Sequence, residues 1–173
     1  VQQPVTVTDI DSDGALTIND ALYLAHETYY DGGAEAGYAS EQSQYGLSLA
    51  KLWGSANGGS YGYYVNNVSA WNLTDPVKDG DHVAVFSYSD LTSWSDMYTF
   101  FDQTALTVKK GESVTLTLSG ACFDEEWNPV TVAVSGADVT LNGEKAGTTD
   151  EEGRITLSPK AGTYTVSAVS KEK

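Results

Sequence analysis

Short segments in which apolar and polar residues alternate recur along this chain, and they constrain its fold more than any other feature. Gly, Asn and Asp residues separate these segments, which is the pattern of half-buried strands joined by tight turns. One segment, residues 18–29, instead carries its apolar residues at helical spacing. Because 40% of the residues are hydrophobic, a packed core is feasible. We therefore expect strands along most of the chain and one helix near its beginning.

The two halves of the chain differ in charge and in aromatic content. Residues 1–103 carry fourteen acids and two bases, and they hold 16 of the 19 aromatic residues. Residues 104–173 have a net charge of only −3. A composition shift of this kind marks a domain boundary. We predict an α+β lobe at 1–103 followed by an all-β lobe at 104–173.

The second lobe is predicted to be a small β-sandwich of immunoglobulin type, because short antiparallel strands at close spacing are typical of that fold. Asn142-Gly143 and residues 150–153 are turn signals between its strands. The predicted strands are 105–108, 113–118, 130–134, 137–141, 154–157 and 164–169. Residues 136–169 resemble the bacterial immunoglobulin-like (prealbumin-like) repeats of surface proteins, in which a G-T-T-D-x-x-G turn precedes an A-G-x-Y-x-V hairpin.

The first lobe is predicted to place one helix on a small mixed sheet, which is the β-grasp arrangement. Its predicted strands are 5–8, 47–49, 61–65 and 82–88. The segments GGSYGYYVNNVSAW and DPVKDGDHVAVFSYSD resemble the transcobalamin carboxy-terminal-like β-grasp family, with Asn67 where its bacterial members usually carry glycine. Those members are secreted or wall-attached proteins of Gram-positive bacteria, so the resemblance implies an extracellular location.

The segment DIDSDGALTIND, which leads into the helix, matches the twelve-residue EF-hand pattern of calcium loops. Three aspartates this close together repel one another unless a hard cation neutralises them. The predicted ligands of a structural Ca²⁺ are Asp9, Asp11, Asp13, the carbonyl of Ala15, and Asp20. The alternative is an acidic, solvated turn whose Asp and Thr residues cap the helix.

The charge of the chain limits its partners. A formal charge of −15 excludes nucleic acid and anionic membranes, because both polyanions would be repelled. No apolar run approaches the ~20 residues that span a bilayer, so we expect no membrane insertion. Because the chain begins at Val1 and Met97 is its only methionine, we expect a module of a longer polypeptide, monomeric by itself.

We expect no enzymatic activity. The two histidines, His26 and His82, are interpreted as structural. The sequence contains no G-x-S-x-G, H-E-x-x-H or phosphate-binding glycine motif. Pairs of carboxylates are abundant only because the chain is acidic, and catalysis by such a pair needs an apolar pocket that raises one pKa.

Aromatic residues in loops and on one tyrosine-rich strand are the strongest indication of function. Sugar rings have an apolar C–H face that suits flat aromatic side chains with a polar rim, and an acidic surface does not repel a neutral glycan. The candidate ligand-binding residues are Trp53, Tyr61, Tyr63, Trp71, Trp94, Tyr98 and Trp127. We predict a non-catalytic module that binds a neutral polysaccharide, with an α-glucan such as starch as the first candidate.

Two other functions stay open at this point. The chain can be a structural spacer or adhesin module that contacts a surface protein, in which case its tryptophans should be buried. It can also capture a corrinoid or another small molecule, as the family name implies, and this function needs a deep apolar cleft.

Overall fold

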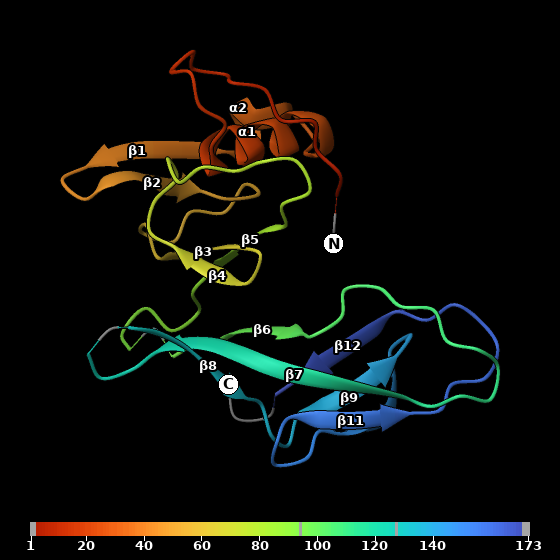
Figure 1. Cartoon of the computed structure of the whole chain (residues 1–173). Helices are drawn as coiled ribbons and strands as arrows, with labels where there is room; N and C mark the ends of the chain where they lie inside the picture. Colours follow the sequence, from red (N-terminus) through yellow and green to blue (C-terminus); the bar gives the residue numbers. More distant parts are fainter. Residues whose placement is uncertain (1–2, 94, 127, 171–173) are drawn as a thin grey trace. The chain divides into compact units, whose positions relative to one another are not determined.

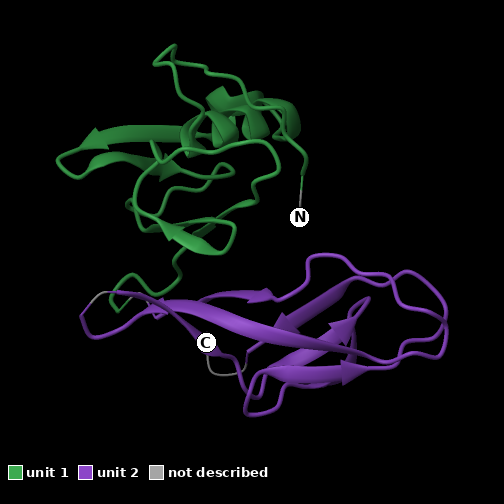
Figure 2. Ribbon diagram, viewed as in Figure 1, with its two compact units in different colours: residues 1–94 green, residues 95–173 purple. Residues whose placement is uncertain are grey.

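The computed structural model describes residues 3–93, 95–126 and 128–170, and the structural statements below refer to these residues. The chain divides into two compact units, 1–94 (unit 1) and 95–173 (unit 2), which are coloured separately in Figure 2. The division falls at 94/95, whereas the composition shift predicts a boundary at 103/104. The difference arises because residues 98–101, which the composition shift assigns to the first lobe, form strand β6 (Tyr98–Phe101), and this strand pairs with β7 (Val114–Phe123) of unit 2.

Unit 1 combines two helices with two antiparallel sheets. Its elements in chain order are α1 (Ile18–Tyr29), α2 (Gly33–Gly37), β1 (Ala39–Ser43), β2 (Gly46–Lys51), β3 (Tyr61–Val65), β4 (Val68–Ala70) and β5 (Val83–Ser87) (Figure 1). Strands β1 and β2 form a hairpin, and the order of the three-stranded sheet is β4-β3-β5. A mixed sheet was predicted, but every ladder between the named strands is antiparallel. Residues 5–8, predicted as a strand, are irregular.

Helix α1 has the bounds that the hydrophobic spacing predicts. Thr17 is its N-cap and forms a capping box with Asp20, in which each side chain accepts from the backbone N–H of the other residue. The next two N–H groups, of Ile18 and Asn19, donate to the carbonyls of Asp75 and Leu73 at 3.1 and 2.9 Å. The first turn is therefore anchored to a distant segment of the chain, which satisfies N–H groups that a helix cannot bond internally.

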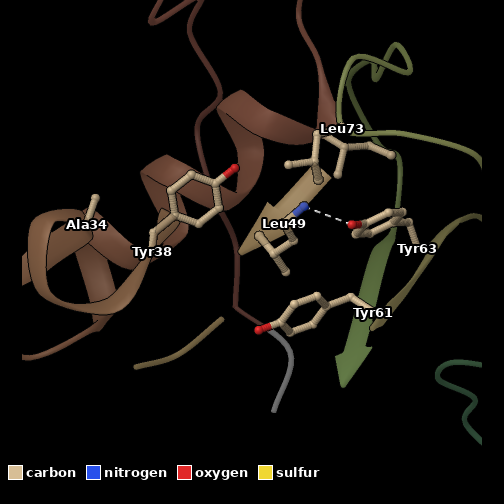
Figure 3. Packing of buried hydrophobic residues seen from close by; sticks show 7 residues of the cluster. Ala34, Tyr38, Leu49, Tyr61, Tyr63 and Leu73 are labelled. Carbon is tan, nitrogen blue, oxygen red and sulfur yellow. Dashed lines mark hydrogen bonds between the residues drawn. The ribbon is translucent and has the colours of Figure 1, made fainter. Parts of the chain in front are cut away.

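The core of unit 1 is built around Leu49 of β2, which is fully buried. Figure 3 shows Leu49 between Tyr38, on the side of the helices, and Tyr61 and Tyr63 of β3. The N–H of Leu49 donates to the Tyr63 hydroxyl at 3.0 Å. This bond gives a donor on the edge of β2 a partner inside an otherwise apolar cluster, which avoids the cost of burying it unpaired.

Unit 2 is a β-structure of two antiparallel sheets. Besides β6 and β7 it contains β8 (Pro129–Ala133), β9 (Asp138–Leu141), β10 (Glu144–Thr148), β11 (Arg154–Leu157) and β12 (Val166–Val169). One sheet has the order β11-β7-β6, with β8 also paired to β7, and the other has the order β10-β9-β12. Leu116, Ile155 and Leu157 of the first sheet pack with Val139 of the second, so the two sheets share one core.

Several details of unit 2 follow the sequence and others do not. The predicted turn Asn142-Gly143 joins β9 to β10 with both residues at positive φ, 52° and 87°, as hairpins with two-residue loops favour. The predicted strand at 105–108 is absent, and those residues form irregular chain. Strands β6 and β10 were not predicted. Among the described residues, no helix is long and apolar enough to cross a lipid bilayer.

We predict that Tyr63→Phe lowers the free energy of unfolding of the chain by about 1–3 kcal/mol, because it leaves the buried N–H of Leu49 without an acceptor. Tyr45→Phe is the matched control, since Tyr45 is 84% exposed, and its effect should stay within about 0.5 kcal/mol. Urea unfolding followed by tryptophan fluorescence measures both. Equal losses in the two variants would contradict this role of Tyr63 in the core.

Candidate functional site

Three carboxylates of the acidic loop lie together ahead of α1. Ligand oxygens of Asp9, Asp11 and Asp13 are all within 4.8 Å of one another. The Asp9 carboxylate also organises the loop backbone, because it accepts from the N–H groups of Ser12 and Gly14 at 2.7 and 2.9 Å. The loop backbone therefore folds around the carboxylate of its first aspartate.

The pKa values of two of these carboxyls move in opposite directions. The N–H of Gly14 is the main cause that lowers the pKa of Asp9, because it stabilises the charged form. Lost solvation raises the pKa of Asp11, and the negative charges of Asp13 and Asp20 raise it further. A cation would relieve the repulsion at Asp11 most directly.

Asp20, the predicted fourth side-chain ligand, has a structural role and lies outside the cluster of three. It is fully buried. Its Oδ1 accepts from the N–H of Ile10 at 3.0 Å, and its Oδ2 accepts from the N–H and the hydroxyl of Thr17 at 2.8 and 2.7 Å. Asp20 thus joins the beginning of the acidic loop to the N-cap of α1. A carboxylate offers about four acceptor positions, so one is left.

Two of the predicted ligand-binding tyrosines belong to the core. Tyr61 and Tyr63 are each only 8% exposed. The hydroxyl of Tyr61 donates to the carbonyl of Ser55 at 3.0 Å, and that of Tyr63 accepts from Leu49. They cannot stack on a ligand in this structure, because β3 is the central strand of its sheet and both of its faces are covered.

Trp53 is half-exposed and packed against the helices. Its indole lies 4.6 Å from the ring of His26 and 5.6 Å from that of Tyr30, measured between ring centroids. Its exposed fraction is 46%. One part of this ring is therefore committed to the fold, and the remaining part faces solvent.

Trp71 is the most exposed of the tryptophans that the structure describes, at 68%. It follows β4, and its backbone N–H donates to the Asp75 carboxylate at 2.8 Å. The neighbouring polar groups are those of Asn72 and Thr74, which hydrogen-bond each other. An exposed indole beside amide, hydroxyl and carboxylate groups is suited to a ligand with one apolar face and a polar edge.

A second exposed ring, Tyr45, lies in the turn between β1 and β2, and it is absent from the residues predicted from the sequence. The N–H of Leu73 donates to the carbonyl of Leu47 at 3.0 Å, and a Cβ on Gly46 would lie 3.4 Å from the Asn72 side chain. Tyr45 and Trp71 therefore each lie two residues before a member of the hydrogen-bonded pair Leu47 and Leu73. We name Tyr45 and Trp71 the aromatic pair. A tyrosine before a glycine in the polar stretch SEQSQYG was the signal that could have found Tyr45.

The remaining predicted residues lie in unit 2 or outside the described part of the chain. Tyr98 of β6 is partly buried and stacks on Phe100, with ring centroids 5.7 Å apart. Trp94 and Trp127 lie outside the described residues. Of the five predicted ligand-binding residues that the structure describes, Trp71 is therefore the most exposed.

Comparisons with known proteins give no match: no protein-family model, no curated protein and no solved structure matches the chain.

We predict that Asp20→Ala destabilises the metal-free protein by about 2 kcal/mol or more, because buried N–H groups of Ile10 and Thr17 lose their acceptor. Asp11→Ala should change the free energy of unfolding by less than about 0.5 kcal/mol in the same buffer, since Asp11 is exposed. Thermal and urea unfolding in the presence of EDTA measure both. A larger loss for Asp11→Ala than for Asp20→Ala would refute these roles.

Proposed function

We propose that this chain is a non-catalytic glycan-binding module that takes a neutral polysaccharide on the aromatic pair. The observation that carries the proposal is the exposure of Tyr45 and Trp71, on two segments that the hydrogen bond from Leu73 to Leu47 joins. Burying a side chain of this size contributes about 1.5–3 kcal/mol to folding. Neither exposed ring makes this contribution to the stability of unit 1. A ligand that covers the rings recovers it on binding.

The charge of unit 1 indicates which polymers can bind. Acids outnumber bases by twelve to two over residues 1–94. Uronic acid, sulfated and phosphorylated polymers are disfavoured there, whereas a neutral glycan is not. An α-glucan such as starch is the first ligand to test. The location we propose is outside the cell, in a secreted or surface-attached protein of Gram-positive bacteria, as the resemblance of residues 5–90 implies.

Unit 2 supports a second role within the same protein. Its two sheets enclose a core of their own, with Leu116, Val139 and Leu157 buried, so it is suited to act as a spacer between other modules. In that arrangement the chain is a monomeric part of a longer polypeptide, and unit 1 makes the contact with the ligand. If the aromatic pair binds no glycan, the spacer or adhesin role with a surface protein as partner is the alternative.

The acidic loop is proposed to hold one structural Ca²⁺. Asp9, Asp11 and Asp13 fit a hard cation, since three carboxylates converge on one point of an exposed loop. The carbonyl of Ala15 and the remaining acceptor position of Asp20 would complete the oxygen ligands. The ion would supply no chemistry. It would neutralise the repulsion among the aspartates and fix the approach to α1.

We predict that the protein is retained on an insoluble neutral polysaccharide, with starch, cellulose and xylan tested in parallel. Trp71→Ala and Tyr45→Ala should each weaken binding at least tenfold, because stacking rings at the centre of an interface carry much of its energy. Trp71→Phe and Tyr45→Phe are matched controls that keep a ring and should keep most of the affinity. Equal losses in the alanine and phenylalanine variants, or no retention on any of these polymers, would refute the proposal.

We predict that millimolar Ca²⁺ raises the melting temperature relative to EDTA by several degrees. At a free concentration of 100 Kd, binding adds about 2.7 kcal/mol to the stability of the folded state. Asp11→Ala should abolish the rise, and Asp31→Ala, an exposed acid outside the loop, should preserve it. Differential scanning calorimetry with Ca²⁺, Mg²⁺ or EDTA provides the measurement. An unchanged melting temperature, or an equal rise in Asp11→Ala, would contradict the site.

A further inference from the structure

His26 of α1 is fully buried, and both of its ring nitrogens have backbone partners. Nδ1 lies 2.6 Å from the carbonyl of Leu22, and Nε2 lies 2.9 Å from the backbone nitrogen of Trp53. A backbone N–H can only donate, so Nε2 must be the acceptor, and a carbonyl can only accept, so Nδ1 must carry the proton. The geometry therefore requires the neutral imidazole.

The surroundings of His26 are aromatic and contain no compensating charge among the described contacts. The rings of Trp53, Tyr38 and Tyr30 lie 4.6, 5.3 and 6.1 Å from the imidazole, and Gly37 of α2 packs against its edge. The hydroxyl of Tyr38 is engaged by the side chain of Asn19. A protonated Nε2 would need a hydrogen-bond acceptor, but it would face the Trp53 N–H, which is itself a donor, and aromatic rings.

The charged side chains on the elements around His26 are directed to other partners. Glu27 of α1 accepts from the N–H of Ala34 at 3.0 Å, and Lys51 of β2 donates to the carbonyl of Ala36 at 3.3 Å. Glu35 of α2 is exposed, and residues 52–55 carry no titratable side chain. Burial lowers the pKa of His26, and the bond to Leu22 offsets only part of that effect.

Residues 52–55 form a tight turn that is held against the helices at two points. Leu52 and Ser55 exchange both of their backbone hydrogen bonds, each at 2.9 Å. The φ angles at Trp53 and Gly54 are +49° and +79°, and this left-handed conformation is unfavourable for a bulky side chain such as that of Trp53. The external ties are the bond from Trp53 to His26 and the bond from the Gly54 N–H to the Gly37 carbonyl at 2.9 Å.

We propose that His26 is a proton-operated latch for the turn at residues 52–55. When Nε2 takes up a proton, it can no longer accept from the Trp53 N–H, and the turn with its indole separates from α1. The turn is closed at neutral pH and opens in acid, which changes how much of Trp53 is presented to solvent. This inference is independent of glycan binding, because it concerns neither residue of the aromatic pair.

The direction and steepness of the effect follow from linkage. The open turn exposes His26, whose pKa then returns to about 6.5, while the closed turn holds the pKa below that value. The closed turn therefore becomes less stable relative to the open turn as the pH falls below about 6.5. The loss continues at about tenfold per pH unit until the lower pKa of the closed form is reached.

The test is hydrogen exchange of individual amides, measured by NMR between pH 7.5 and 5 and corrected for the intrinsic exchange rate. We expect the protection factor of the Trp53 amide to fall about tenfold per pH unit below pH 6.5. The amide of Leu49, which is buried in the same unit, is the internal comparison: it exchanges only when unit 1 unfolds, so its protection factor should stay well above that of Trp53. A flat profile at Trp53, or protection factors of Trp53 and Leu49 that coincide at every pH, would overturn the latch.

Variants separate the two histidines. His26→Gln should give pH-independent exchange at Trp53, and His82→Gln should keep the wild-type profile. If His26→Gln does not fold, the comparison of Trp53 with Leu49 in the wild-type protein decides the question by itself. If the His82→Gln variant loses the pH dependence, His82 and not His26 is its cause, and the proposal is refuted.

Discussion

The backbone of Leu73 makes the two hydrogen bonds on which the arrangement of unit 1 depends. Its N–H donates to the carbonyl of Leu47 at the edge of β2, and its carbonyl accepts from the N–H of Asn19 in the first turn of α1. Its side chain is fully buried in the core. One residue thus ties a strand, a helix and the segment that carries Trp71. Trp71 and Tyr45 each lie two residues from this junction, on the two segments that it joins.

The same junction connects the acidic loop to the core. Asp20 binds the loop at Ile10 and caps α1 at Thr17, in the same first turn in which Leu73 holds Asn19. Neutralising the aspartates of the loop would therefore stabilise the first turn of α1 and, through it, the segment of the aromatic pair. Calcium binding and glycan binding are separate proposals. The acidic loop and the segment of Trp71 are nevertheless connected by hydrogen bonds through the first turn of α1.

Local signals in the sequence were enough for some elements and insufficient for others. The spacing of apolar residues predicted α1, and Asn142-Gly143 predicted its hairpin turn. Strand β1 was missed because its sequence, ASEQS, is polar and only pairing with β2 makes it a strand. The burial of Tyr61 and Tyr63 could not be predicted either, since it depends on β3 being the central strand of its sheet.

Binding of a neutral glycan at the aromatic pair can be followed residue by residue. The ¹⁵N-labelled protein is titrated with soluble oligosaccharides, for example maltoheptaose, and the changes in amide chemical shift are mapped by NMR. We expect these changes to centre on Tyr45, Trp71 and their neighbours Gly46 and Asn72. Changes confined to unit 2, or none with any neutral oligosaccharide at millimolar concentration, would contradict binding at this place.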